Sequence, residues 1–416
     1  ESKEFKAKYA KHPYPPLMDP SKVVWEQTDA RIAWDFNLPL PPFYSMLVSI
    51  LPGAGGSAFY KFLTLCDVDC YSKWYGHHLA YLENYQIFSQ SKNYKALIVT
   101  DFINPFTQKF WSLIDKKMPM LCLVGDVVKV LKTLVNHTRP IEQKPLVKRF
   151  NLTCDYAEIM PQIAYHCSNE KPNLEAVIED CISGLFRSIF CFKEKRDAIK
   201  PSEIIYIDAQ EINAQNAFKT FSALSEKFGF NAPLEQDREV FSQRMNKNTS
   251  LTNAFPVVLY AHPQDIGKKR DFTTLGQNYM VGGGVNIMID TQFDFNKKNA
   301  LNLTQELLPK GIDNKNVVLS VKPQEAGILR AQPKLKKAVQ KFLEGYFKEF
   351  KKREDEIASH LKSPYEVLEY FKMHKKQYNA MRKIFNEELA HIKQVRPDIV
   401  ESWEYYQAFE KIAKVN

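Results

Sequence analysis

A glycine-rich turn between an apolar run and a helical pattern is the first candidate for chemistry in the chain. The run from Met46 to Leu51 has the length and β-branched content of a buried strand, and it stops at Pro52. A strand, a glycine turn and a helix N-terminus in this order present free backbone N–H groups and the positive end of a helix dipole to an anion, usually phosphate. The alternative is a tight turn that needs glycine for its backbone conformation and binds nothing. The turn is not a Walker A loop, because no Gly-Lys-Ser/Thr follows at the required spacing. The candidate anion-binding residues are Gly53, Gly55, Gly56, Ser57 and Ala58.

Two adjacent histidines, His77 and His78, are candidates for a general base. An imidazole titrates near neutral pH, which suits proton abstraction, although single histidines also serve structural roles. The seven cysteines lie mostly within apolar segments and lack the paired spacing of a metal site, so we interpret them as reduced thiols of a cytosolic protein. We therefore expect no metal and no bound cofactor.

Four short apolar segments predict the strands that would position these residues. They cover residues 46–51, 96–100, 120–124 and 203–208, and helical patterns alternate with them. This alternation predicts an α/β fold with a parallel sheet covered on both faces. Ligands bind at the carboxyl ends of such strands, where the glycine turn, Thr100-Asp101 and Gly125-Asp126 would converge. Asp101 has an alternative role as a helix N-cap. His137 and Arg139 follow the helical pattern after Asp126 and are secondary candidates for the same cleft.

The domain organisation is predicted from changes in composition. Residues 1–42 are rich in proline and predict an extended leader packed on the core. Residues 43–330 predict the α/β domain, with a mixed or antiparallel insertion or lid over 231–330. Residues 331–416 predict a helical C-terminal region, whose lysine-rich face is either a solvated surface or a binding surface.

A net charge of +9 over 416 residues favours anionic partners. A nucleotide-linked donor, an anionic polysaccharide and the inner membrane surface all fit this charge, and we do not expect nucleic acid as the partner. The sequence contains no apolar segment of about 20 residues that could span a bilayer, and residues 1–4 do not resemble a signal peptide. We expect a cytoplasmic location, with peripheral contact with the inner membrane or the capsule machinery as an open alternative.

Together, the first loop and the strand ends resemble the sulfotransferase fold. Residues Pro52 to Phe59 align with that family's Pro-Lys-Ser-Gly-Thr-Thr-like loop, which holds the 5′-phosphate side of the donor. Residues Leu123 to Thr133 align with the strand, the Arg-Asp-Pro sequence and the helix that hold the donor's 3′-phosphate. The resemblance places Thr133 at the family's 3′-phosphate serine and Asp101 at its general base. It implies a sulfotransferase-like P-loop core with a three-layer arrangement.

The two cations that usually hold the donor are missing from this sequence. Gly53 occupies the position of the loop lysine, and Gly125 occupies that of the arginine. Lysines on the neighbouring helices could replace them as point charges. These substitutes are Lys61, Lys129 and Lys132, with Asp126 beside them at the strand end.

The whole chain resembles a narrower group, the capsule-locus "sugar transferases" of epsilon-proteobacteria, which includes capsular O-methyl phosphoramidate transferases. This resemblance implies transfer of an O-methyl phosphoramidate group from a 3′-phospho-cytidine-diphosphate donor to a hydroxyl of a capsular polysaccharide sugar. The base would be His77, His78 or Asp101. The alternatives are a sulfotransferase that uses 3′-phosphoadenosine 5′-phosphosulfate on a capsular sugar and a nucleotide-sugar glycosyltransferase.

Overall fold

The computed structural model describes residues 3–71, 77–99, 106–141, 146–168, 170–243, 251–268, 283–292, 295, 300–308 and 317–412. The chain forms two compact units. The first unit comprises Glu1–Leu134, Leu174–Arg244 and Ser363–Asn416, and the second comprises Val135–Asn173 and Met245–Lys362. The limits of these units differ from the predicted division at residues 42, 230 and 330. Among the described residues, no helix combines the length and the apolar character needed to cross a bilayer.

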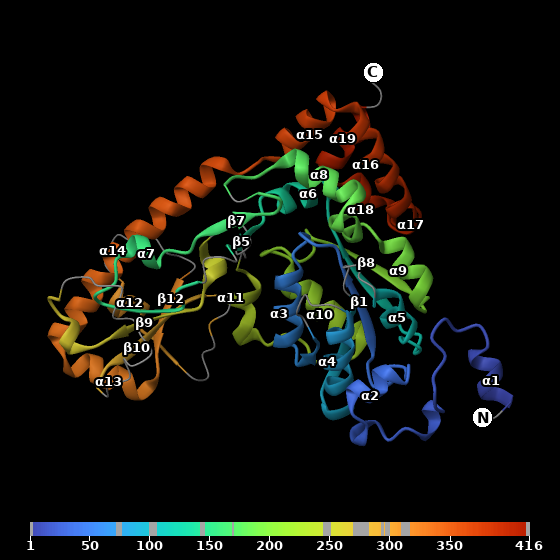
Figure 1. The fold of residues 1–416 in the computed structure, drawn as a ribbon, viewed down its shortest axis with the longest axis horizontal. Helices are drawn as coiled ribbons and strands as arrows, with labels where there is room; N and C mark the ends of the chain where they lie inside the picture. The colour runs from blue at the N-terminus through green and yellow to red at the C-terminus, as the bar shows by residue number, and fades with distance from the viewer. Residues whose placement is uncertain are drawn as a thin grey trace. The chain divides into compact units, whose positions relative to one another are not determined.

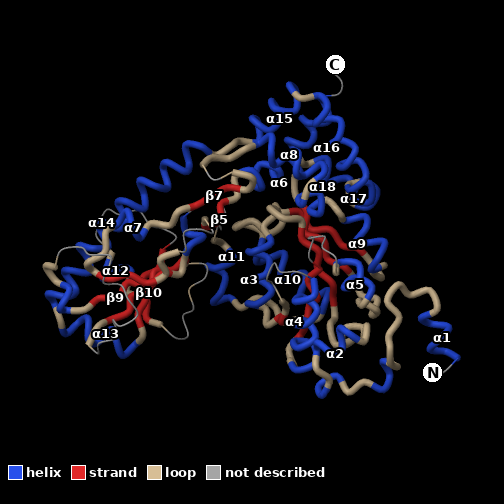
Figure 2. Tube along the Cα trace, in the orientation of Figure 1, coloured by secondary structure: helices blue, strands red, loops and turns tan. Residues whose placement is uncertain are grey.

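The first unit is built on a five-stranded parallel sheet (Figures 1 and 2). Its strands lie in the order β2-β3-β1-β4-β8, and neighbouring strands pair in parallel throughout. The central strand β1 is buried along its whole length, as its predominantly apolar sequence predicts. Its Val48 lies opposite Ile98 of β3 and Leu121 of β4. The strands are β1 (Met46–Ile50), β2 (Val68–Asp69), β3 (Tyr94–Val99), β4 (Met120–Val124) and β8 (Ile204–Asp208).

Helices cover both faces of this sheet (Figure 1). Successive strand residues point to opposite faces, so Val48 and Ser49 belong to different layers. Val48 joins a hydrophobic cluster with residues of α3 (Gly56–Leu65), α10 (Ala217–Phe228) and α11 (Arg238–Phe241). Ser49 on the other face contacts Lys195 of α9 (Phe192–Ile199). Helix α9 contacts α5 (Thr107–Ser112), which contacts α4 (His77–Gln90). The predicted mixed α/β class with a parallel sheet is confirmed.

The N-terminal leader contains helices and is not extended throughout. Its elements are α1 (Lys3–Tyr9), the short turns η1 (Pro20–Lys22) and η2 (Trp25–Gln27), and α2 (Ala30–Asp35). Helix α2 forms between the proline clusters because Asp29 caps it and no proline interrupts it. The leader lies against α4, where the hydroxyl of Tyr81 donates a hydrogen bond to the carbonyl of Leu38 at 2.9 Å.

The C-terminal region is helical, as predicted. It comprises α15 (Pro364–Met373), α16 (Lys375–Glu388), α17 (Ala390–Val395), α18 (Pro397–Glu401) and α19 (Glu404–Ile412). Helix α15 begins with a capping box between Ser363 and Glu366. These helices belong to the first unit together with α6 (Val127–Val135), α8 (Leu174–Ser183) and η3 (Leu185–Ile189).

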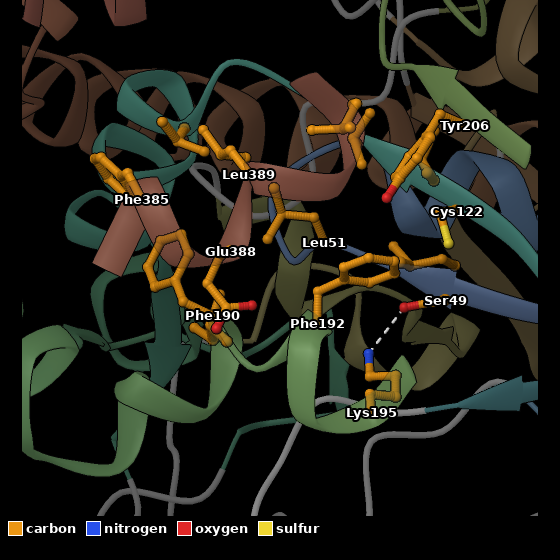
Figure 3. A pocket seen from close by; sticks show the side chains of 16 residues that line it. Ser49, Leu51, Cys122, Phe190, Phe192, Lys195, Tyr206, Phe385, Glu388 and Leu389 are labelled. Atoms are coloured by element: carbon orange, nitrogen blue, oxygen red, sulfur yellow. Dashed lines mark hydrogen bonds between the residues drawn. The ribbon is translucent and has the colours of Figure 1, made fainter. Parts of the chain in front are cut away.

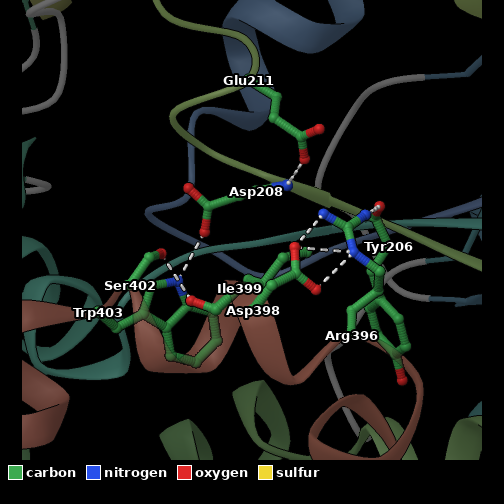
Figure 4. Close-up of polar contacts among 8 residues, drawn as sticks. All are labelled: Tyr206, Asp208, Glu211, Arg396, Asp398, Ile399, Ser402 and Trp403. Atoms are coloured by element: carbon green, nitrogen blue, oxygen red, sulfur yellow. Dashed lines mark hydrogen bonds and ion pairs between the residues drawn. The ribbon is translucent and has the colours of Figure 1, made fainter.

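Polar contacts, of which the Trp403–Asp208 contact is buried, attach the C-terminal helices to the parallel sheet (Figure 4). At the carboxyl end of β8, Asp208 accepts a 2.6 Å hydrogen bond from the indole N–H of Trp403. Trp403 is 1% exposed. Arg396 donates to both carboxylate oxygens of Asp398 and, at 3.3 Å, to the carbonyl of Tyr206. The last helices are therefore part of the same core as the sheet.

The second unit contains a mixed five-stranded sheet of order β11-β12-β10-β9-β6. Strand β6 pairs in parallel with β9, and the other described pairs are antiparallel. The strands are β6 (Arg149–Asn151), β9 (Val257–Ala261), β10 (Val285–Thr291), β11 (Leu301–Asn302) and β12 (Val317–Val321). A separate pair of strands, β5 (Thr138–Pro140) and β7 (Ile163–Tyr165), is antiparallel.

The long helix α14 (Pro333–His360) belongs to the second unit and not with the other C-terminal helices. Its predicted apolar stripe, which includes Leu335, Val339 and Tyr346, joins one hydrophobic cluster with strand residues such as Leu259 and Ile287. The burial of this stripe explains why the unit boundary lies at residue 362. The remaining helical elements of this unit are α7 (Tyr156–Ile159), η6 (Leu251–Ala254), η7 (Pro263–Asp265), α12 (Thr304–Leu307) and α13 (Pro323–Ala331).

Candidate functional site

The glycine turn after β1 adopts the conformation for which its glycines are needed. Gly53 has a φ of 86° and Gly55 a φ of 98°, both in the left-handed region that L side chains rarely adopt. The amide of Ala54 closes the turn by donating to the carbonyl of Leu51 at 3.0 Å. Helix α3 then begins at Gly56. The predicted sequence of strand, glycine turn and helix is therefore present.

The N-terminus of α3 offers backbone donors. Its first hydrogen bond runs from the amide of Phe59 to the carbonyl of Gly55 at 3.1 Å. The amides of Gly56, Ser57 and Ala58 precede this bond, so the helix itself supplies them with no acceptor. Ser57 is exposed, and α3 is 10 residues long. The helix dipole therefore adds partial positive charge at the end where these amides and a serine hydroxyl are found.

The second predicted loop lies directly beside this turn. A Cβ atom built on Gly53 would lie 3.3 Å from Cβ and Cγ2 of Thr133 in α6, and one built on Gly125 would lie 3.5 Å from Cβ of Ala54. The connection after β1 leads toward β3 and β2, whereas the connection after β4 leads toward β8. The crevice between β1 and β4 is thus the switch point of the sheet, the usual position of ligands in open α/β folds.

The predicted cationic residues of α6 occur on one face of that helix. Lys129, Lys132 and Thr133 are spaced three and four residues apart, and Gly53 packs against this face at Thr133. The ammonium of Lys129 lies 5.1 Å from the ring centre of Tyr405, and the hydroxyl of Thr133 donates to the carbonyl of Lys129 at 2.9 Å. Lys61 lies on α3 and is half-buried. The structure therefore brings the first loop and the α6 face together.

Asp126 has a structural role that the sequence did not indicate. Its carboxylate accepts hydrogen bonds from the amides of Val128 (3.0 Å), Tyr405 (2.9 Å) and Tyr406 (3.3 Å). Burial raises the pKa of Asp126, and these amide donors oppose that rise. Asp126 thus caps α6 and α19 at once. Because an anionic carboxylate repels phosphate, we remove Asp126 from the donor-binding set.

The structure describes the three candidate bases to different extents. His77 is the first residue of α4, and its side chain is not described. Asp101 lies outside the described residues. The His78 ring is half-buried, with its centre 5.1 Å from that of Trp34 and 6.0 Å from that of Phe106. This aromatic neighbourhood restrains the imidazole of His78.

The secondary candidates His137 and Arg139 belong to the second unit, whereas the loop belongs to the first. The His137 ring stacks on that of His166 with centres 4.5 Å apart. Burial lowers the pKa of His137 and lowers that of His166 to about 4. Both imidazoles are therefore held neutral. The sequence did not suggest this histidine pair, because its two members are far apart in the chain.

Sequence reasoning also missed the contribution of the chain's end to the surroundings of the loop. Tyr405 and Tyr406 contact Asp126, and Trp403 contacts Asp208, so the start of α19 lies at the carboxyl ends of β4 and β8. These contacts join residues far apart in sequence. Trp403 could have indicated this contact, because a tryptophan in a polar helical segment is usually packed against the protein core with its N–H group hydrogen-bonded.

Among the residues that the structure describes, no group of three or more His, Cys, Asp or Glu side chains could hold a metal ion. The described residues at the loop offer backbone amides, the Ser57 hydroxyl and the ammonium groups of Lys61, Lys129 and Lys132.

A family model described as "Protein of unknown function (DUF2972)" matches residues 206–415. The match begins within β8 and includes the C-terminal helices, whereas the glycine turn, α3, β4 and α6 precede it. No curated protein and no solved structure matches the chain. Since the family model covers just over half of its length, the chain belongs to the DUF2972 family of proteins of unknown function.

Proposed function

We propose that the protein is a transferase that moves an O-methyl phosphoramidate group from a 3′-phospho-cytidine-diphosphate donor to a hydroxyl of a capsular polysaccharide sugar. One observation carries the nucleotide part of this proposal. The glycine turn and the N-terminus of α3 lie beside the Lys129, Lys132 and Thr133 face of α6, at the switch point of a parallel sheet. This arrangement supports a sulfotransferase-like P-loop core, and the resemblance to the capsule-locus transferases supports the transferred group and the acceptor.

We call the turn, the N-terminus of α3 and the Lys129, Lys132 and Thr133 face of α6 the nucleotide cradle. Its two parts would bind different phosphates of the donor. The amides of Gly56, Ser57 and Ala58, with the Ser57 hydroxyl, would hold the phosphate from which the group departs. Lys129, Lys132 and Thr133 would hold the 3′-phosphate, because a lysine reaches a phosphate as a point charge. Lys61 is one helical turn beyond Ser57 and would add a further cation.

Transfer also requires a base at the acceptor hydroxyl. His77, His78 and Asp101 remain the proposed candidates, and α4 begins with the two histidines just beyond the carboxyl end of β2. All parallel strands end at the same edge of the sheet, so α4 begins at the edge that also carries the glycine turn. A base there would accept the hydroxyl proton during in-line transfer.

Ligand-induced stabilisation tests the donor class. The thermal midpoint is measured with cytidine 3′,5′-bisphosphate, adenosine 3′,5′-bisphosphate and a sugar nucleotide without a 3′-phosphate. A ligand at 100 times its Kd stabilises the native state by about 2.7 kcal/mol. We expect the cytidine compound to raise the midpoint most. A larger shift with the adenosine compound would favour the sulfotransferase, and a shift with the sugar nucleotide alone would favour the glycosyltransferase.

A transfer assay tests the chemistry. The full chain is incubated with donor and capsular sugar, and the product is followed by phosphorus NMR and mass. Ser57→Ala combined with Lys132→Ala should abolish transfer, whereas Lys375→Ala combined with Lys376→Ala on α16 should leave it unchanged. Transfer that survives the first pair of substitutions would exclude the cradle.

A peripheral membrane location is the second part of the proposal. On α14, five exposed lysines lie within about 60° of one another around the helix and cover about 27 Å of its length. These lysines face away from the buried apolar stripe of α14. They are Lys334, Lys337, Lys341, Lys348 and Lys352. Lys348 forms an ion pair with Glu344 at 2.6 Å, so the other four lysines supply the positive row. Such a row suits an anionic lipid surface, where each lysine contributes about 1 kcal/mol of attraction.

A further inference from the structure

A pair of partly exposed tyrosines lies beside the nucleotide cradle. Tyr405 is the second residue of α19, and the ammonium nitrogen of Lys129 on α6 lies 5.1 Å from its ring centre. The ring centre of Tyr365, the second residue of α15, lies 5.3 Å from that of Tyr405, and the two ring planes make an angle of 76°. Tyr365 is 60% exposed, and Tyr405 is half-buried. The pair therefore offers aromatic surface next to the α6 face of the cradle.

Polar contacts fix the backbone that carries these rings. The amide of Tyr405 donates a 2.9 Å hydrogen bond to Asp126, the residue that caps α6. Two residues earlier, the buried indole of Trp403 donates to Asp208 at the end of β8 (Figure 4). Tyr365 lies in the first turn of α15, which begins with a capping box. A ligand that contacts this pair therefore meets a preorganised surface, and binding orders little of the chain.

A second place for a planar group near the cradle is a cavity on the sheet face opposite α3 (Figure 3). Leu51, just before the glycine turn, and Val127, the first residue of α6, contribute to its wall. Water-sized molecules can occupy about 50 Å³ of this cavity. A nucleobase needs more space than that. A planar ring bound at the cradle therefore fits the exposed tyrosine pair better than this cavity.

We propose that Tyr365 and Tyr405 form the platform on which the base of the nucleotide donor stacks. This inference rests on the proposed function, because it takes the α6 face as the site of the 3′-phosphate. Lys129 belongs to that face and also contacts the ring of Tyr405, so the phosphate site and the platform are adjacent. The base and the 3′-phosphate of a nucleotide are attached to the same ribose ring, which places them at a similar separation.

The chemistry of the platform favours a nucleotide over the sugar acceptor. Every nucleobase has a flat π face, and such faces stack on aromatic side chains. A sugar hydroxyl needs no cation, whereas the 3′-phosphate of the stacked nucleotide is neutralised by Lys129. Both tyrosines lie within residues 206–415, which the family model matches, and the phosphate-binding part of the cradle precedes them. The C-terminal helices therefore complete a site that begins much earlier in the chain.

Two ligands that differ only in the base test the proposal by calorimetric titration of the full chain. Deoxycytidine 3′,5′-bisphosphate carries the base, and the corresponding tetrahydrofuran abasic bisphosphate keeps both phosphates and lacks the base. We expect the wild type to bind the ligand with the base at least about fivefold more tightly, because a stacked base usually contributes this much. Tyr365→Ala should reduce this preference to less than about twofold and leave the affinity for the abasic ligand unchanged.

Two control variants should keep the full preference for the base. Tyr365→Phe retains the aromatic ring, and Phe36→Ala removes an aromatic side chain of 40% exposure from the leader. Because the side chain of Tyr365 is exposed, the thermal midpoint without ligand should be little changed by its substitution.

The outcomes distinguish the platform from the cradle. Equal binding of the two ligands by the wild type would overturn the platform and leave the cradle standing. A preference that persists in Tyr365→Ala combined with Tyr405→Ala would do the same, and a higher KM for the capsular sugar in that variant would then assign the tyrosines to the acceptor. Failure of the wild type to bind either ligand would overturn the cradle and the platform together.

Discussion

The contact between Gly53 and Thr133 allows a sharp test of the idea that the glycine turn and α6 form one site. Gly53→Ala introduces two separate penalties. The φ of 86° costs a non-glycine residue about 1–2 kcal/mol, and the new Cβ would lie 3.3 Å from two carbon atoms of Thr133, which then must shift by a few tenths of an ångström.

Gly229 provides a matched control in the same unit. It ends α10 with a φ of 77°, and nothing lies within 4 Å of a Cβ built there. Gly229→Ala therefore carries the conformational penalty alone, which we expect to lower the free energy of unfolding by about 1 kcal/mol. Gly53→Ala adds overpacking, for which about 1 kcal/mol more is a moderate value, so a loss of about 2 kcal/mol is expected.

The assay combines urea unfolding of both variants with thermal shifts in cytidine 3′,5′-bisphosphate. Gly53→Ala should unfold at the lower urea concentration and lose most of the nucleotide-induced shift, because the α6 face no longer lies correctly against the turn. Gly229→Ala should keep the full nucleotide-induced shift. Equal stability losses, with the shift retained in both variants, would refute the reasoning that Gly53 positions α6 for the donor.

Three other predictions concern the remaining parts of the molecule. Asp126→Ala removes the acceptor of three backbone amides, whose hydrogen bonds are buried or part-buried, and should lower the free energy of unfolding by about 2–3 kcal/mol. Asp398→Ala on the exposed Arg396 pair is a mild control, and an equal loss of stability in the two variants would contradict the capping of both helices by Asp126. The pKa of His166 is about 4 in the folded protein and about 6.5 when unfolded, so its contribution to stability is complete above pH 6.5 and is lost as the pH falls toward 4. After allowance for the partial exposure of His166, we expect the free energy of unfolding to fall by about 2 kcal/mol over this pH range. Urea unfolding of the wild type should therefore depend more steeply on pH than that of His166→Phe, and identical pH profiles would exclude this contribution of His166. Reversing Lys337, Lys341 and Lys352 to Glu should weaken sedimentation with phosphatidylglycerol-containing vesicles at least 100-fold at low salt, whereas reversing the exposed Lys375, Lys376 and Lys383 should have little effect; equal effects would argue against a membrane-facing α14.

The sequence predicted the local elements of the parallel sheet because each strand carries its own signal. The segments at 46–51, 120–124 and 203–208 are predominantly apolar, with Ser49, Glu203 and Asp208 as polar exceptions, as in strands buried on both faces. The glycine turn was also predictable, since Gly53 and Gly55 are needed for positive φ. These features depend on residues close together in the chain.

The features that could not be predicted depend on contacts between distant segments. Helix α14 has the same lysine-rich amphipathic pattern as a member of a C-terminal bundle, and only its packing with Leu259 and Ile287 assigns it to the second unit. Asp126 looked like a ligand at a strand end, because its partners Tyr405 and Tyr406 follow almost 280 residues later.

Lys195 illustrates the same limit within a single helix. Its local sequence, Phe-Lys-Glu-Lys-Arg-Asp, predicts a solvated surface, and five of these six residues are charged. The burial of Lys195 follows from the position of α9 against the sheet, where Ser49 accepts its hydrogen bond. A charge pattern alone does not reveal which member of a charged run points inward.

The account's central claim is that the turn after β1 holds the phosphate of a nucleotide donor. The most direct measurement is a crystal structure of the full chain with cytidine 3′,5′-bisphosphate. We predict the 5′-phosphate within hydrogen-bond distance of the amides of Gly56, Ser57 and Ala58, and the 3′-phosphate near Lys132 and Thr133. A nucleotide bound elsewhere, with the N-terminus of α3 in contact with solvent only, would contradict the claim.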